Sequence, residues 1–270
     1  MKAGFYQFLP AFGNKDGNLK KVMSAVKDAD LDLIVLPEFF ATGYQFVSKD
    51  EAAELSEQIP EGHTTKFLSE LSHQKGLYIV AGLPEKDGDR FFNSAVFIGP
   101  DGFIGVYRKT HLFFEEKLFF SHGDTGFKVW DTEIGRIGIM ICFDWFFPES
   151  MRALALMGAV IIAHPSNLML PYCPYAIPVR CIENRTYAIT ANRIGEENRK
   201  EGQSLRFIGQ SLIVSPEGKV LAKASEDEEI LLITDIEPEL ARNKFLTPLN
   251  NIFDDRRPEV YSNITVKKSQ

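Results

Sequence analysis

Short apolar runs that alternate with helical patterns constrain the fold of this chain more than any other feature. Residues 2–9 and 31–36 predict strands, and the continuous apolar character of 31–36 is typical of a strand buried on both faces. Between them, residues 17–29 predict a helix whose apolar face is made of Leu19, Val22, Met23 and Val26. A helix over 64–75 and a strand over 77–82 repeat this order, which predicts an α/β fold.

Two segments, 95–102 and 211–218, share one pattern: an apolar run followed by Pro, an acidic residue and Gly. Pro presets the first turn position and Gly favours a positive φ, so each segment predicts a hairpin. The repeat predicts a four-layer α-β-β-α sandwich, in which two mixed sheets flanked by helices pack face to face. The alternative is coincidence, since such turns are common. No linker divides the chain, so we expect a single domain over residues 1–270, with 243–270 as a C-terminal extension.

Composition narrows the class of partner. The chain has 37 acidic and 30 basic residues, a net charge of -7 and no basic block, so the electrostatic footprint of a nucleic-acid-binding protein is missing. A small-molecule partner is expected instead. No signal peptide and no apolar run long enough to cross a membrane are recognised. Three sparse cysteines do not suit a disulfide framework, and they favour a reducing, cytoplasmic location.

Cys142 is the most informative single residue. It closes the apolar run 137–141, and a helix start follows it. A strand, a sharp turn and a helix in this order expose a nucleophile at the rim of a sheet, near a helix N-terminus whose partial positive charge favours the thiolate. The alternative is a core cysteine, because free cysteine is among the most buried residue types.

Two further reactive groups follow predicted strands. Glu38 comes after strand 31–36, and Lys109 comes after strand 103–108. Side chains from distant parts of an α/β chain converge at strand ends, so we expect both residues to meet Cys142 there. Taken singly, each could instead be a solvated surface residue.

Together these three groups fit attack on a carbon bonded to nitrogen. A carboxylate can take the thiol proton, and the sulfur can then add to an amide or nitrile carbon. The Lys109 ammonium and the backbone N–H of Phe143 are candidates to stabilise the developing oxyanion. Loss of one oxyanion donor costs on the order of 10²–10³ in rate in other enzymes, so Lys109 is expected to be nearly indispensable.

These residues lie in segments that resemble the three signature stretches of the nitrilase, or carbon-nitrogen hydrolase, superfamily. The segments are Leu36-Pro37-Glu38-Phe39, Tyr107-Arg108-Lys109-Thr110-His111-Leu112 and Met140-Ile141-Cys142-Phe143-Asp144. The resemblance implies the same sandwich, assembly into a homodimer or a higher homo-oligomer, and a Glu-Lys-Cys triad with neither metal nor cofactor. Glu38 would be the general base, Lys109 the oxyanion stabiliser and Cys142 the nucleophile.

The resemblance also implies a second glutamate shortly after the lysine. The spacing selects Glu116, which would position Lys109 and the substrate without transferring protons; a solvated Glu115 or Glu116 is the alternative. His111 is interpreted as structural, and whether it or Glu115 contributes to the site stays open.

Residues further along the chain complete the predicted site. Asn167 follows the predicted strand 159–163 and is expected to hydrogen-bond the substrate, or else to cap its own loop. Aromatic residues after the three reactive groups, including Tyr44 and Trp145, are expected to wall a narrow pocket or to belong to the core. Residues 175–187 predict a helix whose first turns Pro178 restricts.

The reaction within the superfamily is the least constrained inference. Nitrile-hydrolysing relatives commonly have Trp-Glu after the cysteine, whereas Phe143-Asp144 resembles the amidase and carbamoyl-amide branches. We therefore expect hydrolysis of a small amide to acid and ammonia, with small aliphatic nitriles as the alternative substrates. Two hypotheses of other classes are a ligand-binding module on a catalytically retired scaffold and a redox sensor that uses Cys142.

Overall fold

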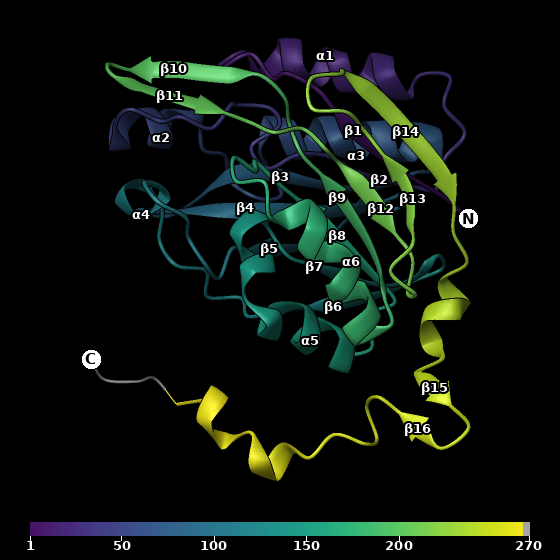
Figure 1. Ribbon diagram of the computed structural model, residues 1–270. Coiled ribbons are helices and arrows are strands. Elements are labelled where there is room, and N and C mark those ends of the chain that lie inside the picture. Colours follow the sequence, from purple (N-terminus) through teal and green to yellow (C-terminus); the bar gives the residue numbers. More distant parts are fainter. Residues whose placement is uncertain (267–270) are drawn as a thin grey trace.

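Two six-stranded mixed sheets form the centre of the molecule (Figure 1). The computed structural model describes residues 1–266. The strands of the first sheet are β1 (Lys2–Gln7), β2 (Leu33–Val35), β3 (Tyr78–Asp87), β4 (Arg90–Gly99), β5 (Gly102–Arg108) and β14 (Ile230–Asp235). Those of the second are β6 (Val129–Thr132), β7 (Gly135–Ile139), β8 (Ile161–Pro165), β9 (Tyr187–Ala191), β12 (Leu212–Val214) and β13 (Val220–Lys223).

The two sheets have matching topologies. The first has the order β14-β1-β2-β3-β4-β5 and the second β13-β12-β9-β8-β7-β6. In each, three central strands run parallel and the outer neighbours run antiparallel. Both predicted hairpins are confirmed: Gly102 and Gly218, at φ 116° and 80°, supply the positive φ that the turns between β4 and β5 and between β12 and β13 require.

Helices cover the outer faces of both sheets, which confirms the four-layer sandwich (Figure 1). Leu19, Val22 and Leu68 join a core cluster with Ile34 and Ile79 of the first sheet. The helices on that side are α1 (Lys15–Val26) and α3 (His63–Lys75), and those on the side of the second sheet are α5 (Pro148–Leu156) and α6 (Cys173–Asn184).

A larger cluster fills the space between the sheets. It joins Phe5 and Val35 of the first sheet to Ile139, Ile162 and Ile189 of the second. The inner strands therefore carry apolar residues on both faces, as the continuous apolar runs predict.

The sequence patterns misplace two helices. The helix predicted over 17–29 corresponds to α1 and ends three residues earlier than predicted. Met23, which was expected on the buried face of this helix, is 45% exposed. The predicted helix 175–187 also ends too late. Arg185 adopts a left-handed conformation at φ 49° and ends α6. Pro178 lies inside this helix.

Smaller elements surround one end of the sandwich and form the C-terminal region. They are α2 (Lys49–Leu55), α4 (Glu116–Phe119), the hairpin β10 (Glu196–Lys200) and β11 (Gln203–Arg206), strands β15 (Phe245–Thr247) and β16 (Asn250–Asn251), and the 3-10 helices η1 (Cys142–Phe146), η2 (Pro238–Arg242), η3 (Pro258–Val260) and η4 (Ser262–Ile264).

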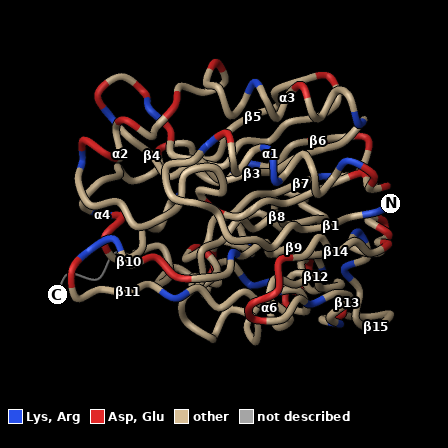
Figure 2. The backbone as a smooth tube through the Cα atoms, turned by 90° about the horizontal axis from the view of Figure 1, so that it is seen from above, with Lys and Arg blue, Asp and Glu red and all other residues tan. Residues whose placement is uncertain are grey.

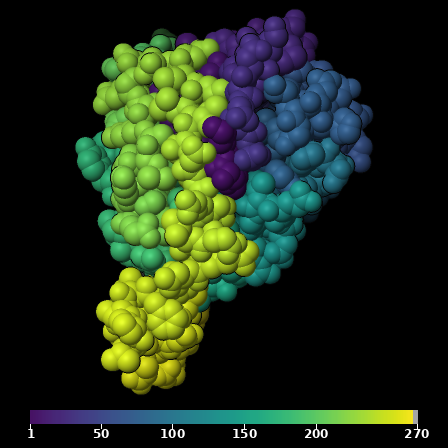
Figure 3. Space-filling model, turned by 90° about the vertical axis from the view of Figure 1, so that its right-hand side faces the viewer, coloured from purple at the N-terminus to yellow at the C-terminus, as the bar shows by residue number. Residues whose placement is uncertain are grey.

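The C-terminal extension leaves the body of the molecule as an arm (Figures 1 and 3). Its predicted range, 243–270, includes four residues, 267–270, that lie outside the described residues. Lys and Arg are interspersed with Asp and Glu over the surface of the molecule, with no large block of either charge (Figure 2). Within residues 1–266, no helix combines the length and apolar character that crossing a membrane requires.

Candidate active site

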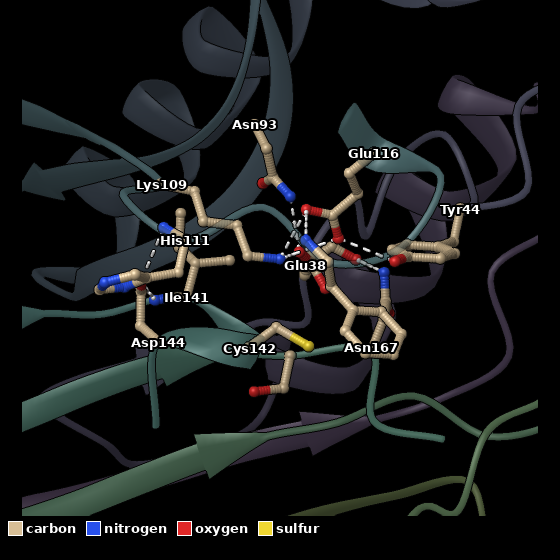
Figure 4. A network of polar contacts seen from close by, with 12 residues as sticks. Glu38, Tyr44, Asn93, Lys109, His111, Glu116, Ile141, Cys142, Asp144 and Asn167 are labelled. Atoms are coloured by element: carbon tan, nitrogen blue, oxygen red, sulfur yellow. Dashed lines mark hydrogen bonds and ion pairs between the residues drawn. The ribbon is translucent and has the colours of Figure 1, made fainter. Parts of the chain in front are cut away.

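A buried ion cluster lies where β2 and β5 end (Figure 4). Lys109 Nζ donates to Glu38 Oε1 at 2.7 Å and to both oxygens of Glu116 at 2.8 and 2.9 Å. Glu38 and Lys109 are fully buried, and Glu116, the first residue of α4, is 4% exposed. Glu115 instead pairs with Lys200 at 2.7 Å. The structure thus brings together three of the predicted residues.

The backbone around Glu38 is tightly packed. Asn93 Nδ2 donates to Glu38 Oε1 at 2.6 Å, and Asn167 Nδ2 donates to the Glu38 carbonyl at 2.8 Å. A Cβ atom on Gly82 would lie 2.6 Å from Glu38 Cα, so glycine allows β3 to approach the base. Glu38 Oε2 has no hydrogen-bond partner although it is buried. One carboxylate oxygen is therefore free to take a proton.

Cys142 stands at a strained turn beside this cluster. It is the first residue of η1, and its φ is 41°, a left-handed conformation that costs a non-glycine residue about 1–3 kcal/mol. Its sulfur points toward Glu38 and Lys109 (Figure 4). His164 Nε2 lies 2.9 Å from the Cys142 carbonyl, and burial lowers the pKa of His164 to about 4. A neutral His164 can therefore donate to that carbonyl and hold the turn.

Asp144 ties the nucleophile segment to the lysine segment. Its carboxylate accepts hydrogen bonds from the Ile141 N–H at 2.9 Å, the Tyr107 hydroxyl at 2.8 Å and the His111 N–H at 3.1 Å. His111 Nδ1 lies 2.8 Å from the same carboxylate. The structural interpretation of His111 agrees with this placement.

Burial sets the protonation of the site. It raises the pKa of Glu38 to about 7, while the Lys109 ammonium opposes the rise and the Glu116 carboxylate adds to it. For Lys109, burial favours the neutral amine, but the Glu116 and Glu38 carboxylates outweigh it and raise the pKa above its usual range. Lys109 therefore stays a cation.

Burial and the Glu38 carboxylate raise the pKa of Cys142 well above its usual range. The expectation that a helix N-terminus favours the thiolate is therefore wrong for this site. The reason is that η1 is a single short 3-10 turn and Cys142 is only 4% exposed. The resting residue is a thiol, which needs a base to become a nucleophile.

A narrow, mainly apolar pocket opens beside the sulfur. The pocket is lined by Phe113, Cys142, Phe143, Trp145, Phe146, Asn167, Leu168, Met169 and Leu170. Three of the four predicted substrate contacts thus lie on its wall. The fourth, Tyr44, does not: it is buried, and its hydroxyl donates to Glu116 Oε1 at 2.8 Å. Asn167 Oδ1 is buried without a partner, so it can accept a hydrogen bond from a ligand.

Sequence reasoning missed Asn93, Asp144 and the Tyr44 hydroxyl as parts of the site. Asn93 carries no local signal that could have found it. Tyr44 was expected only to wall the pocket or to belong to the core, and no local signal indicates that its hydroxyl contacts Glu116. Asp144 had one, because it is a charged residue two positions after the nucleophile in an otherwise apolar stretch. Among residues 1–266 there is no group of three or more His, Cys, Asp or Glu arranged to hold a metal.

The geometry suits nucleophilic attack on a polarised carbon. A thiol lies beside a carboxylate whose pKa is near neutrality, and a permanent cation lies behind both. In the resting site, Lys109 Nζ makes three hydrogen bonds to carboxylate oxygens. An oxyanion would therefore be stabilised by the positive charge of Lys109, or would replace a carboxylate oxygen as the acceptor of one of these hydrogen bonds.

Comparison with known proteins gives a consistent set of similarities. The model of the carbon-nitrogen hydrolase family matches residues 2–244. A protein from Pyrococcus abyssi named "Nitrilase" is 51% identical over 97% of this chain and 99% of its own. An "(R)-stereoselective amidase" from a Pseudomonas species is 35% identical over 84% of this chain and 82% of its own. The crystal structure of a carbon-nitrogen hydrolase from Helicobacter pylori superposes with a TM-score of 0.88 at 27% identity, covering 99% of both chains.

Proposed function

Because the chain belongs to the carbon-nitrogen hydrolase family, we propose that it hydrolyses a small amide to a carboxylic acid and ammonia through a thioester on Cys142. The observation that carries this proposal is the buried contact of Lys109 with both Glu38 and Glu116, beside the Cys142 sulfur. A carboxylate, an ammonium and a thiol close together support the proposed roles of base, cation and nucleophile.

In the first half of the reaction, Glu38 takes the thiol proton of Cys142 and the sulfur adds to the amide carbon. The carbonyl oxygen becomes an oxyanion, stabilised by the Lys109 charge and the Phe143 N–H. When the carbon–nitrogen bond breaks, the nitrogen takes the proton from Glu38 and leaves as ammonia. A pKa of about 7 suits Glu38 to this exchange, since a group that titrates near neutrality can both accept and return a proton.

In the second half, Glu38 takes a proton from water, and the hydroxide adds to the thioester carbon. The carbon–sulfur bond then breaks, the sulfur recovers the proton, and the acid is released. The free oxygen Glu38 Oε2 supports this role, because no protein group competes for it.

The other predicted residues have supporting roles in the proposal. Glu116 positions Lys109, and Tyr44 positions Glu116 through its hydroxyl. Trp145 and Phe143 wall the pocket, and Asn167 Oδ1 accepts an N–H from the substrate. This last contact favours an amide, since a nitrile has no N–H to donate. No metal or cofactor has a step in the mechanism.

Hydrolysis of small aliphatic nitriles is the second candidate. The 51% identical relative from Pyrococcus abyssi carries the name nitrilase, which favours it. The same thiol, base and cation can serve a nitrile carbon, because addition of the sulfur gives a negatively charged nitrogen in place of an oxyanion.

The test compares the native protein with Cys142→Ala on a panel of small amides and nitriles, with ammonia release as the readout. The native protein is expected to release ammonia and to show a covalent acyl adduct by mass spectrometry, and Cys142→Ala to show neither. Release that persists in Cys142→Ala would contradict the nucleophile assignment. No release on any substrate would favour a retired, ligand-binding scaffold.

The proposal also includes a homodimer and a cytoplasmic location. Three apolar side chains of α6, Tyr175, Val179 and Ile182, are 74%, 48% and 48% exposed, which supports a partner on that face. The three cysteines are free and buried, which is consistent with a reducing compartment.

A further inference from the structure

Arg193 and Glu197 form a buried ion pair that the catalytic proposal leaves unused. Arg193 is fully buried and Glu197 is 6% exposed. Arg193 Nη1 donates to Glu197 Oε1, and the guanidinium lies 4.2 Å from the centre of the Phe207 ring. Arg193 Nη2 has no hydrogen-bond partner. Such a charge is costly to bury, so its counter-ion Glu197 is required here.

The Glu197 carboxylate holds the end of the loop that begins at the base. It accepts hydrogen bonds from the Tyr44 N–H at 3.1 Å and from the Gln45 N–H at 2.5 Å. Two consecutive N–H groups on one anion form a defined backbone cradle. The loop needs such support because Phe39, directly after Glu38, has a strained φ of 49°.

Tyr44 connects Glu197 to the buried ion cluster. Its backbone is fixed by Glu197, and its hydroxyl donates to Glu116 Oε1 at 2.8 Å. Glu116 in turn accepts two hydrogen bonds from Lys109 Nζ. We propose that the Arg193–Glu197 pair is a positioning element that fixes Tyr44 and, through it, holds Glu116 and Lys109 in their working geometry.

This inference rests on the proposed function, but it can be tested apart from it. A pair that only stabilises the fold would lower the melting temperature and leave the folded site unchanged. A positioning pair must also change the reactivity of Cys142, because a shift of about 1 Å in a supporting group can cost roughly 10²-fold in rate.

The experiment uses Glu197→Gln, which keeps the shape of the side chain and removes its charge. Two readouts are followed: kcat and KM for ammonia release from an amide, and the rate at which iodoacetamide alkylates Cys142, measured by peptide mass spectrometry. We expect kcat to fall roughly 10-fold with KM within about twofold, and alkylation to slow at least about threefold. For Arg193→Lys, which keeps the charge, kcat and the alkylation rate should lie between those of Glu197→Gln and those of the native protein.

Glu51→Gln is the matched control. Glu51 also pairs with an arginine, Arg199 of β10, at 2.6 Å, and accepts the Val47 N–H at 2.8 Å, but it makes no hydrogen bond to Tyr44 in the described part of the chain. It should leave both readouts at native values. If Glu197→Gln does not fold, Arg193→Lys decides the question by the same two readouts.

A double-mutant cycle with Tyr44→Phe tests the route. If Glu197 acts through Tyr44, the loss in the double variant is smaller than the product of the two single losses. Losses that multiply, or a folded Glu197→Gln that has native kcat and native alkylation, would overturn the inference. If the native protein hydrolyses neither amides nor nitriles, the proposed function fails, and the alkylation rates still decide the positioning role.

Discussion

At the scale of single residues, the protonation of Glu38 governs the proposed reaction. Burial of the carboxyl, which contacts the Lys109 cation that also binds the Glu116 carboxylate, raises its pKa to about 7 from an ordinary value of 4.5. In the free protein Glu38 must be ionised to accept the thiol proton. A pH below 7 therefore removes the base, whereas Lys109, with its raised pKa, keeps its charge well above neutrality.

This predicts the shape of the pH profile. We expect kcat/KM to fall tenfold per unit as the pH drops below about 7, and to stay level from about pH 8 to pH 9.5. The measurement is ammonia release across this range with an amide that has no ionisable group, so that the acid limb belongs to the protein. A midpoint near 4.5 would show that the base is a group in ordinary solvent.

The residues that can be predicted from the sequence are those whose role is local. Lys109 follows β5 directly, Glu38 and Cys142 lie three positions after the ends of β2 and β7, and Glu116 lies a short loop beyond Lys109, so the motifs and the strand ends are enough to select them. The Tyr44 hydroxyl and Asn93 could not be selected in this way. Their contacts with Glu116 and Glu38 exist only after segments 72 and 55 residues apart come together.

At the scale of elements, the turn at Cys142 is a strained point of the fold. The left-handed backbone of Cys142 opens η1 shortly after β7, and Asp144 fixes it from within the same turn. The side chain of Asp144 acts only as an acceptor, for hydrogen bonds from Ile141, Tyr107 and His111. Short-range patterns predict that a helix starts here, but they do not reveal which side chain stabilises the strained backbone of Cys142.

Asp144→Asn should therefore be strongly destabilising. The amide places an N–H₂ group where donors already converge, and an unsatisfied buried donor costs about 1–3 kcal/mol, so we expect the free energy of unfolding to fall by at least about 2 kcal/mol. Denaturant unfolding of the purified variant measures this. Asp131→Asn is the control, since Asp131 pairs with Arg136 at the surface, and its unfolding midpoint should match the native protein. Equal midpoints for both variants would contradict the role given to Asp144.

Element boundaries were less predictable than element order. Apolar periodicity predicts that α6 exists, but the helix ends where Arg185 adopts a left-handed conformation. Arginine rarely adopts this conformation, so the sequence does not indicate where the helix ends. In α1, Met23 matches the apolar spacing yet faces solvent, because Leu19, Val22 and Val26 already fill the space above the first sheet.

At the scale of the whole molecule, the two halves of the chain build equivalent sheets, and this much follows from the repeated hairpins. The exception is β14, which crosses from the second half to pair antiparallel with β1. Its partner lies more than 200 residues away, and no local pattern encodes that pairing. This strand links the two halves of the chain, and the C-terminal arm is made of residues that follow it.

The exposed apolar face of α6 predicts that two copies of the chain associate. Tyr175, Val179 and Ile182 are spaced i, i+4 and i+7, so they share one exposed face, and a second copy of the chain can cover it through the same face. We expect light scattering to give the native protein twice the mass of one 30.5 kDa chain, and Val179→Asp to give the mass of one chain, because a buried carboxylate opposes association. Met23→Asp, on the exposed side of α1, is the control and should keep the native mass. A native protein of single-chain mass, or a Val179→Asp variant that stays paired, would exclude α6 as the contact face.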